Sequence, residues 1–229
     1  MRQDTIEKSA EAPATRATGI YERLKADILS AELEPGRKLQ LRFLTEHYGS
    51  GQTPIREALN RLASEELVIG KEQRGFFVKP ISLDELQELT KTRCWVEGIA
   101  LSESIQRATA DWEEALLIAH HRLDRTPRSL DPENFKDNPE WERHHRRFHA
   151  LLIGNCGSKP LIGFCEQLAD RLYRYRALSI RKAFRVRKVS DEHVQIFKAA
   201  IERRTEDAVA LLQNHYRRTA DIIRADLGE

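Results

Sequence analysis

Apolar residues along the first third of the chain predict three helices followed by two short strands. Helices are indicated where apolar positions repeat every three or four residues, and strands where short β-rich runs flank a polar turn. The residues that carry these patterns are Ile20, Leu24 and Ile28; Leu41, Leu44 and Tyr48; Ile55, Leu59 and Leu62; Leu67–Ile69; and Gly75–Val78.

Turn and capping residues set the ends of these elements. The first helix is expected to end near Ser30, before the turn Glu34–Gly36, and Gly49 closes the second helix. Thr53 is expected to cap the third helix, with Pro54 at its first helical position. Three helices and a two-stranded wing outline a winged helix-turn-helix.

The rest of the chain shows helical spacing only, after a linker at Pro80-Ile81. We therefore expect a mostly α fold, in which a winged helix-turn-helix over residues 18–80 precedes an all-helical bundle of about six helices over residues 81–229. Residues 1–17 are small, polar and charged, which predicts a disordered tail. The bundle's helix starts are signalled by the capping box Ser82–Glu85 and at Asp111, Asn138-Pro139, Ser158–Pro160, Ser190 and Thr205.

Composition excludes several classes of protein. The chain has 229 residues, of which 40% are hydrophobic and 32% charged, as in globular proteins with a sizeable core. No apolar run approaches the roughly 18 residues that span a membrane, and the first residues lack the apolar stretch of a signal peptide. Three scattered cysteines indicate free thiols in a reducing compartment rather than a disulfide framework. A cytoplasmic location is therefore expected.

The net charge is only +2, so the distribution of charge is more informative than its sum. Residues 37–79 hold eight basic and five acidic side chains, whereas residues 171–188 hold eight basic and no acidic ones. The first cluster lies in the predicted winged helix-turn-helix. The second has three interpretations: a solvated face, a basic patch at a dimer interface, or part of a site for an anionic effector.

The third helix has the features of a helix that enters the major groove of DNA. Arg56 lies in its first turn and Arg61 further along, and the backbone N–H groups after Thr53 offer a phosphate site. Arg42 could reach the DNA backbone, and Arg74-Gly75 at the tip of the wing could approach a minor groove or a phosphate. A single arginine is more often plain solvated surface, but the combined pattern favours DNA binding.

Residues 20–79 resemble the DNA-binding domain of the GntR family of bacterial repressors. The resemblance implies that Arg42, Arg56 and Gly75 contact DNA. The family usually has Ser or Thr followed by a guanine-reading arginine before the Thr-Pro pair, whereas this chain has Gly51-Gln52. Glutamine suits adenine, so we expect a shifted operator sequence or the loss of that base contact. The resemblance is carried by Ile20-Tyr21, Leu24, Ile28, Leu33, Pro35-Gly36, Leu39, Leu44, Tyr48-Gly49, Thr53–Leu59, Leu62 and Arg74–Val78.

Four histidines in the second part have spacing that could form a metal site. His145 and His149 lie four residues apart on one helix and share a face. His193 and His215 lie on the apolar faces of two other predicted helices. Converging imidazoles inside a bundle could bind zinc or nickel. From spacing alone, however, a histidine on an apolar face is more often a hydrogen-bonded core residue.

Residues 83–226 resemble the FadR-type, all-helical ligand-binding domain of the same family. Many members bind a metal with one Asp and three His; His149, His193 and His215 match the histidines, and His145 stands where the Asp is expected. A neutral imidazole keeps a donor atom but removes a negative charge, which could give a four-His site, weaken metal binding or open the cavity to an anionic effector. The matching stretches are Arg93–Ala100, His145–His149, Glu192–Ala200 and Ala208–His215.

The resemblance also implies a carboxylate effector. Arg93 is the arginine that it indicates for effector binding, followed by Arg174 and its neighbours Arg171 and Arg176. The surroundings of His145 and the segment Cys156–Ser158 are similar to the carbon-starvation regulators of the family, a branch that responds to dicarboxylates such as glutarate.

The sequence thus predicts an effector-gated repressor that reads an inverted repeat as a homodimer. Two other kinds of protein fit the sequence less well. A metal-dependent hydrolase could use the histidines to activate water, but the chain has no HExxH motif and no well-spaced carboxylate base. A protein-binding winged helix is disfavoured by the basic residues on the groove-facing positions.

Overall fold

The computed structural model describes residues 16–131, 133–183 and 187–228. Within them the chain falls into two compact units, divided between Pro80 and Ile81. The tail expected over residues 1–17 lies outside the described residues, apart from its last two positions, which begin the first helix.

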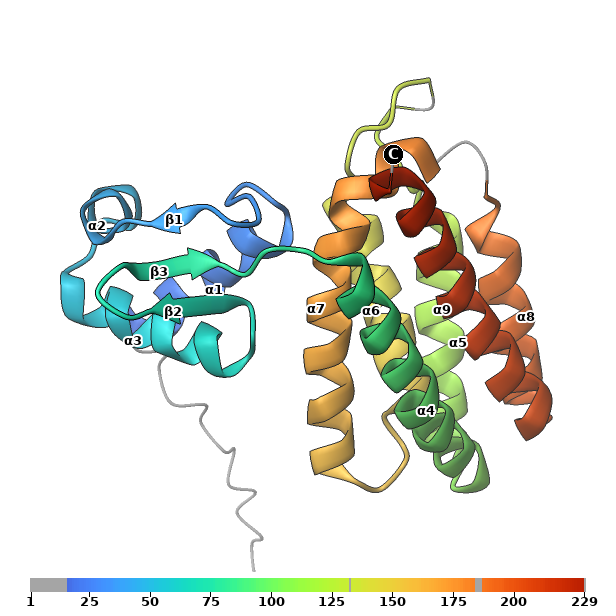
Figure 1. The fold of residues 1–229 in the computed structure, drawn as a ribbon. Coiled ribbons are helices and arrows are strands. Elements are labelled where there is room, and N and C mark those ends of the chain that lie inside the picture. Colours follow the sequence, from blue (N-terminus) through green and yellow to red (C-terminus); the bar gives the residue numbers. More distant parts are fainter. Residues whose placement is uncertain (1–15, 132, 184–186, 229) are drawn as a thin grey trace, which may run out of the picture. The chain divides into compact units, whose positions relative to one another are not determined.

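The N-terminal unit, in its described part, has three helices and a three-stranded antiparallel sheet (Figure 1). The strand order is β1-β3-β2, with Leu39 opposite Phe76 and Lys71 opposite Gly75. This confirms the winged helix-turn-helix. The elements are α1 (Arg16–Leu29), β1 (Lys38–Leu39), α2 (Leu41–Tyr48), α3 (Gln52–Ser64), β2 (Val68–Lys71) and β3 (Gly75–Val78).

Two details of this unit differ from the sequence prediction. The strand β1 was not predicted, because two residues are too few to show the alternation of a strand. The third helix was expected to begin at Pro54 after a Thr53 cap, but α3 begins at Gln52 and its N-cap is Gly51. Gly51 offers no capping side chain, and Thr53 falls within the first turn.

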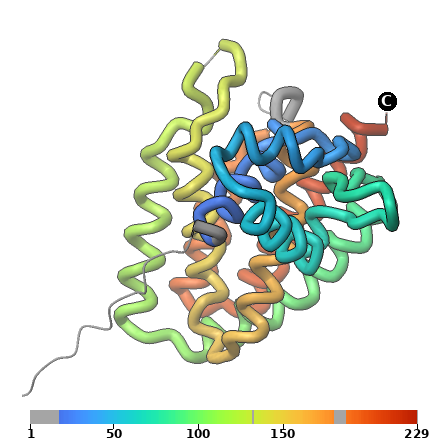
Figure 2. Tube along the Cα trace, turned by 90° about the vertical axis from the view of Figure 1, so that its left-hand side faces the viewer, coloured from blue at the N-terminus to red at the C-terminus, as the bar shows by residue number. Residues whose placement is uncertain are grey.

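The C-terminal unit is a bundle of helices that lie side by side (Figures 1 and 2). Its described part contains six helices, as predicted. Helix α4 packs against α7 and α9, while α5 packs against α6 and α8. None of the helices among the described residues is long and apolar enough to cross a membrane. The helices are α4 (Leu83–Gln106), α5 (Ala110–Arg125), α6 (Pro139–Ile153), α7 (Lys159–Ala183), α8 (Val189–Ile201) and α9 (Thr205–Leu227).

Most of the predicted helix starts hold in this unit. Asn138 caps α6 by accepting hydrogen bonds from two backbone N–H groups, and Pro139 occupies the first turn. Two starts were one residue late: α5 begins at Ala110 behind the cap Thr109, and α8 begins at Val189.

The predicted capping box at the start of α4 involves a third residue. The Ser82 side chain accepts a hydrogen bond from the Glu85 N–H, as expected. The Ser82 N–H donates to the Tyr175 hydroxyl at 3.2 Å, and that hydroxyl donates to the Glu85 carboxylate at 2.8 Å. The beginning of α4 is therefore fastened to α7 by the same bonds that cap it.

Candidate functional site

The first turn of α3 is exposed in the N-terminal unit. Ile55 and Leu59 are completely buried and hold the helix against the core of the unit. Gln52, Thr53 and Arg56 lie on the exposed side. Their side chains, together with the N–H groups at the start of the helix, are therefore accessible to DNA.

The other predicted DNA contacts on α2 and the wing are also exposed. Arg42 has 92% of its side chain exposed, although its Nε lies 3.2 Å from the Glu46 carboxylate. Arg74 and Gly75 are exposed where β2 turns into β3. Gly75 has φ 88°, in the left-handed region that favours glycine, so the tight turn of the wing depends on it.

Arg61 lies elsewhere. Its guanidinium stacks 3.6 Å from the centre of the Tyr21 ring on α1, and its Nε lies 3.7 Å from the Glu65 carboxylate. Five residues along a helix correspond to a rotation of about 140°, which carries Arg61 away from the side that presents Arg56. The structure therefore separates Arg61 from the other predicted DNA contacts.

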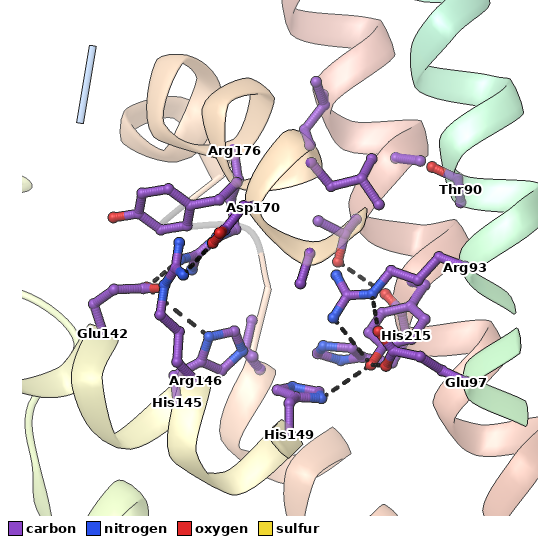
Figure 3. Close-up of a pocket in the computed structure, with 18 of the residues that line it drawn as sticks. Thr90, Arg93, Glu97, Glu142, His145, Arg146, His149, Asp170, Arg176 and His215 are labelled. Atoms are coloured by element: carbon purple, nitrogen blue, oxygen red, sulfur yellow. Dashed lines mark hydrogen bonds and ion pairs between the residues drawn. The ribbon is translucent and has the colours of Figure 1, made fainter. Parts of the chain in front are cut away.

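The four histidines of the C-terminal unit converge. Helix α6 supplies His145 and His149, α8 supplies His193 and α9 supplies His215. One ring nitrogen from each lies within 4.8 Å of the others. His149, His193 and His215 are 7%, 2% and 5% exposed. Figure 3 shows His145 and His149 beside each other on one helix, with His215 facing them.

The histidine cluster fits a divalent metal ion. Tetrahedral zinc with Zn–N distances of about 2.1 Å requires ligand nitrogens about 3.4 Å apart, so small side-chain movements would close this cluster around an ion. In the described part of the chain, three buried ring nitrogens have no hydrogen-bond partner: His145 Nδ1, His149 Nε2 and His193 Nε2. A buried nitrogen without a partner is costly, and a metal ion would satisfy it.

Burial also keeps these imidazoles in the form that binds metals. It lowers the pKa of His145 to about 3 and that of His215 to about 4, because the charged ring would lose its hydration. The pKa values of His149 and His193 are well below the ordinary value for the same reason. All four rings are neutral at pH 7, so each has a lone pair to offer.

The outer nitrogens of two histidines contact polar side chains that are buried or partly buried. His215 Nδ1 lies 2.9 Å from the Glu192 carboxylate, which also pairs with Arg187. His149 Nδ1 lies 3.1 Å from the hydroxyl of Tyr216. Such contacts on the far side of a ring fix its orientation toward a metal.

A cavity of about 350 Å³ adjoins the histidine cluster, with His145, His149 and His215 in its wall. Figure 3 shows Arg93 and Glu97 on one side of it and Glu142 and Arg176 on the other. The cavity is rich in cations and in aromatic rings. Its charged and aromatic lining, besides the histidines, comprises Arg93, Arg128, Arg146, Arg176 and Arg187; Glu97, Glu142, Glu166 and Asp170; and Trp141, Tyr173 and Tyr216.

The two arginines predicted to bind the effector have different positions. Arg93 lines the cavity and donates from Nε to Glu97 at 2.7 Å. Arg174 does not line it; this side chain is 2% exposed and lies within the bundle near Glu85 and Arg171. Among the arginine side chains that the structure describes on α7, Arg176 lines the cavity; two residues along a helix are about 200° apart, which separates it from Arg174.

Sequence reasoning named Arg176 only as a neighbour of Arg174, and it missed Arg128, Arg146 and Arg187 of the cationic wall. Arg176 donates to Glu142, and Arg146 bridges Glu142 at 3.1 Å and Asp170 at 2.6 Å. A signal was available for α7: Asp170, Tyr173 and Arg176 are spaced by three, so they share a face. Arg128 and Arg187 lie outside the helices, where no periodicity could place them.

Two family descriptions match the chain. "Bacterial regulatory proteins, gntR family" matches residues 16–78, and "FCD domain" matches residues 88–218. Among curated proteins, the chain is similar to the uncharacterized HTH-type transcriptional regulator BphR of Paraburkholderia xenovorans, with 34% identity over 89% of this chain and 83% of BphR. It is also similar to the HTH-type transcriptional repressor GlaR of Escherichia coli, with 33% identity over 85% of this chain and 90% of GlaR.

Solved structures share the fold. E. coli McbR/YncC superposes with a TM-score of 0.77 at 21% identity, covering 93% of this chain and 99% of that one. A GntR family member from Pseudomonas syringae gives a TM-score of 0.53 at 25% identity, covering 93% of this chain and 86% of that one.

Proposed function

This chain belongs to the GntR family of bacterial regulatory proteins and is a DNA-binding transcriptional regulator, and we propose that it is a cytoplasmic repressor controlled by a small carboxylate. The carboxylate binds in the cavity of the C-terminal unit, together with a divalent metal ion. The observation that carries this proposal is the convergence of four buried histidines beside an arginine-lined cavity. The relatives are regulators, which leaves the metal-dependent hydrolase without support.

The metal ion, zinc or nickel, is held by His145, His149, His193 and His215. Its chemistry is that of a Lewis acid and fixed cation, which attracts a carboxylate oxygen. Four neutral imidazoles leave the whole charge of the ion in place, whereas an aspartate ligand would cancel part of it. The substitution of His145 for the family's aspartate therefore favours an anionic effector.

The arginines supply the second half of the effector site. Arg176 and Arg146 lie on the wall of the cavity that carries Glu142, and a planar guanidinium suits a carboxylate better than any other side chain. A short dicarboxylate such as glutarate has one end for the metal and one for an arginine. A volume of about 350 Å³ is in the range of small-molecule sites. Arg93 belongs to the same cavity, and Arg174 is not needed.

In the N-terminal unit, we propose that the DNA contacts are the exposed ones: Arg42, Gln52, Thr53, Arg56, Arg74 and Gly75. Arg61 is left out because it stacks on Tyr21. Two copies of the unit, brought together in a homodimer, read the halves of an inverted repeat. An effector controls binding only if it has different affinities for the DNA-competent and DNA-incompetent arrangements of the dimer.

The proposal is tested by measuring operator affinity with and without glutarate. An operator is first selected from random duplexes, and its affinity is measured by fluorescence anisotropy at fixed salt concentration. We expect glutarate with Zn²⁺ to change the affinity by about fivefold or more, and a chelator to remove that change. Arg176→Ala should abolish the response, and the matched control Arg174→Ala should keep it if the protein remains folded. A chelator-insensitive response would refute the role of the metal.

A further inference from the structure

Two buried residues, Glu97 and Tyr216, and the partly buried Arg93 form a chain of hydrogen bonds that ends on the metal-site candidate His149. Arg93 and Glu97 lie on α4, and Tyr216 lies on α9. Arg93 Nε donates to one Glu97 oxygen at 2.7 Å, and Arg93 Nη2 donates to the Tyr216 hydroxyl at 3.2 Å. Tyr216 donates to the other Glu97 oxygen and lies 3.1 Å from His149 Nδ1. Glu97 is 2% exposed and Tyr216 6%.

The positions of the protons follow from this arrangement. Guanidinium groups only donate, and an ionised carboxylate only accepts. The single proton of the Tyr216 hydroxyl is therefore committed to Glu97, and the hydroxyl oxygen receives the bond from Arg93. Tyr216 has no proton left for His149, so the 3.1 Å contact requires His149 to donate from Nδ1. The other nitrogen, Nε2, then carries the lone pair, and this is the buried atom that lacks a hydrogen-bond partner among the described residues.

We propose that Arg93, Glu97 and Tyr216 are positioning residues that hold His149 in the Nδ1–H form and aim its Nε2 at the metal. The inference rests on the metal site proposed above. It gives Arg93 a role different from the effector contact that the family resemblance implied. Arg93 neutralises the buried Glu97, which in turn fixes the Tyr216 hydroxyl.

A second arrangement of the same kind holds His215. Its Nδ1 lies 2.9 Å from the Glu192 carboxylate and 3.3 Å from Nη2 of Arg187. The shorter contact is with a group that only accepts, and Arg187 already donates to Glu192 and to the His215 backbone oxygen, so we assign the proton to Nδ1 and the lone pair to Nε2. Arg187 braces this contact by donating to Glu192 and to the backbone oxygen of His215. Two independent networks thus impose the same tautomer on ligands from different helices. Both carboxylates are largely removed from water, Glu97 at 2% exposure and the Glu192 side chain at 13%, and such placement is costly unless a partner needs it.

The network also ties the metal site to the helix that follows the boundary between the two units. Arg93 and Glu97 project from α4, which begins at Leu83, directly after the boundary at Pro80-Ile81. A metal bound at Nε2 would withdraw electrons from the ring and so strengthen the donation from Nδ1. The hydrogen bond from His149 to Tyr216, and through Tyr216 the contact with α4, would then be stronger.

The first experiment uses the wild-type protein without metal. Long-range ¹H–¹⁵N correlation spectra of the imidazoles report which ring nitrogen carries the proton, and His149→Gln assigns the signal. We expect His149 in the Nδ1–H form at pH 7. An Nε2–H form would overturn the proposal, whether or not the protein binds a metal. Absence of Zn²⁺ binding would instead remove the proposed metal function and leave the tautomer result standing.

The second experiment measures Zn²⁺ affinity by competition with a chromophoric chelator. Tyr216→Phe removes the hydroxyl and should weaken Zn²⁺ binding by about 10- to 100-fold, the usual cost of losing such a partner. Tyr173→Phe is the matched control, because Tyr173 lines the same cavity and its ring faces Arg146 and Arg176 rather than a histidine of the cluster. The Zn²⁺ affinity of this variant should stay within about twofold of wild type. Equal affinities for the two folded variants would refute the proposal. If Tyr216→Phe does not fold, the wild-type spectra decide.

Discussion

Zinc binding should stabilise the folded protein strongly, and the effect should depend on the histidine cluster. Two buried ring nitrogens without hydrogen bonds, Nε2 of His149 and Nε2 of His193, each cost the metal-free fold about 1–3 kcal/mol. A metal that binds only the folded chain adds RT ln(1 + [L]/Kd) to the free energy of unfolding, or about 4 kcal/mol at 1,000 times Kd. For a chain of this size, each kcal/mol raises Tm by about 2–4 °C. We therefore expect Tm to rise by about 8–16 °C.

The assay is thermal unfolding of chelator-treated protein, followed by circular dichroism with and without Zn²⁺. His149→Ala removes one ligand and should abolish most of the Zn²⁺-induced shift. His121→Ala is the control, because His121 is exposed on α5 and outside the cluster. Unchanged Tm in the wild-type protein would refute the metal site. An equal shift in wild type and His149→Ala would show that Zn²⁺ acts elsewhere on the surface.

Further changes test the roles of single residues. His145→Asp restores the ligand that the family resemblance implies and should keep metal binding. It should weaken glutarate binding, measured by calorimetry, by about tenfold or more. The reason is that the new aspartate and a glutarate carboxylate about 4 Å away would repel by several kcal/mol at a dielectric of about 20. Arg56→Ala should lower operator affinity and reduce the slope of log K against log salt by about 1, whereas Arg61→Ala should leave that slope unchanged and lower Tm. Gln52→Arg should shift the selected operators toward guanine at one position of each half-site, as deep sequencing of the selected pool would reveal.

Helical periodicity was sufficient to bring the histidines to the inside of the bundle. His145 and His149 share a face because they are four residues apart, and His193 lies on the same face of its helix as Ile196 and Ala200, which are fully buried. Burying the apolar faces of α6, α8 and α9 therefore buries these imidazoles. Spacing within one helix does not show, however, whether residues on three different helices lie at the same level along the bundle axis. The expectation that the rings converge came from the family resemblance.

Other residues could not be placed from the sequence for equally specific reasons. Helix α7 is buried on more than one side, so its apolar positions did not decide whether Arg174 or Arg176 faces the cavity. Arg61 resembles Arg56 in charge, but the two lie about 140° apart around the helix, and the structure places Arg61 against Tyr21 and Glu65. Arg187 lies between α7 and α8, where no helical periodicity indicates the direction of its side chain.

The replacement of the family's aspartate by His145 has a counterpart one turn earlier on the same helix. Glu142 lies 3.9 Å from His145 Nδ1, so an aspartate at position 145 would place two carboxylates against each other. With a neutral ring there, Glu142 stays ionised, and the nearby Arg176 holds its pKa well below the ordinary value. The carboxylate on this helix therefore pairs with Arg176, the guanidinium that the proposed effector would use, and not with the proposed metal. A carboxylate effector must compete with Glu142 for Arg176. The free energy that it gains there is the difference between its own ion pair with Arg176 and the ion pair of Glu142 with Arg176. This competition favours ligands that have a second carboxylate, because a ligand that also reaches the proposed metal binds more favourably than one that only replaces Glu142 at Arg176.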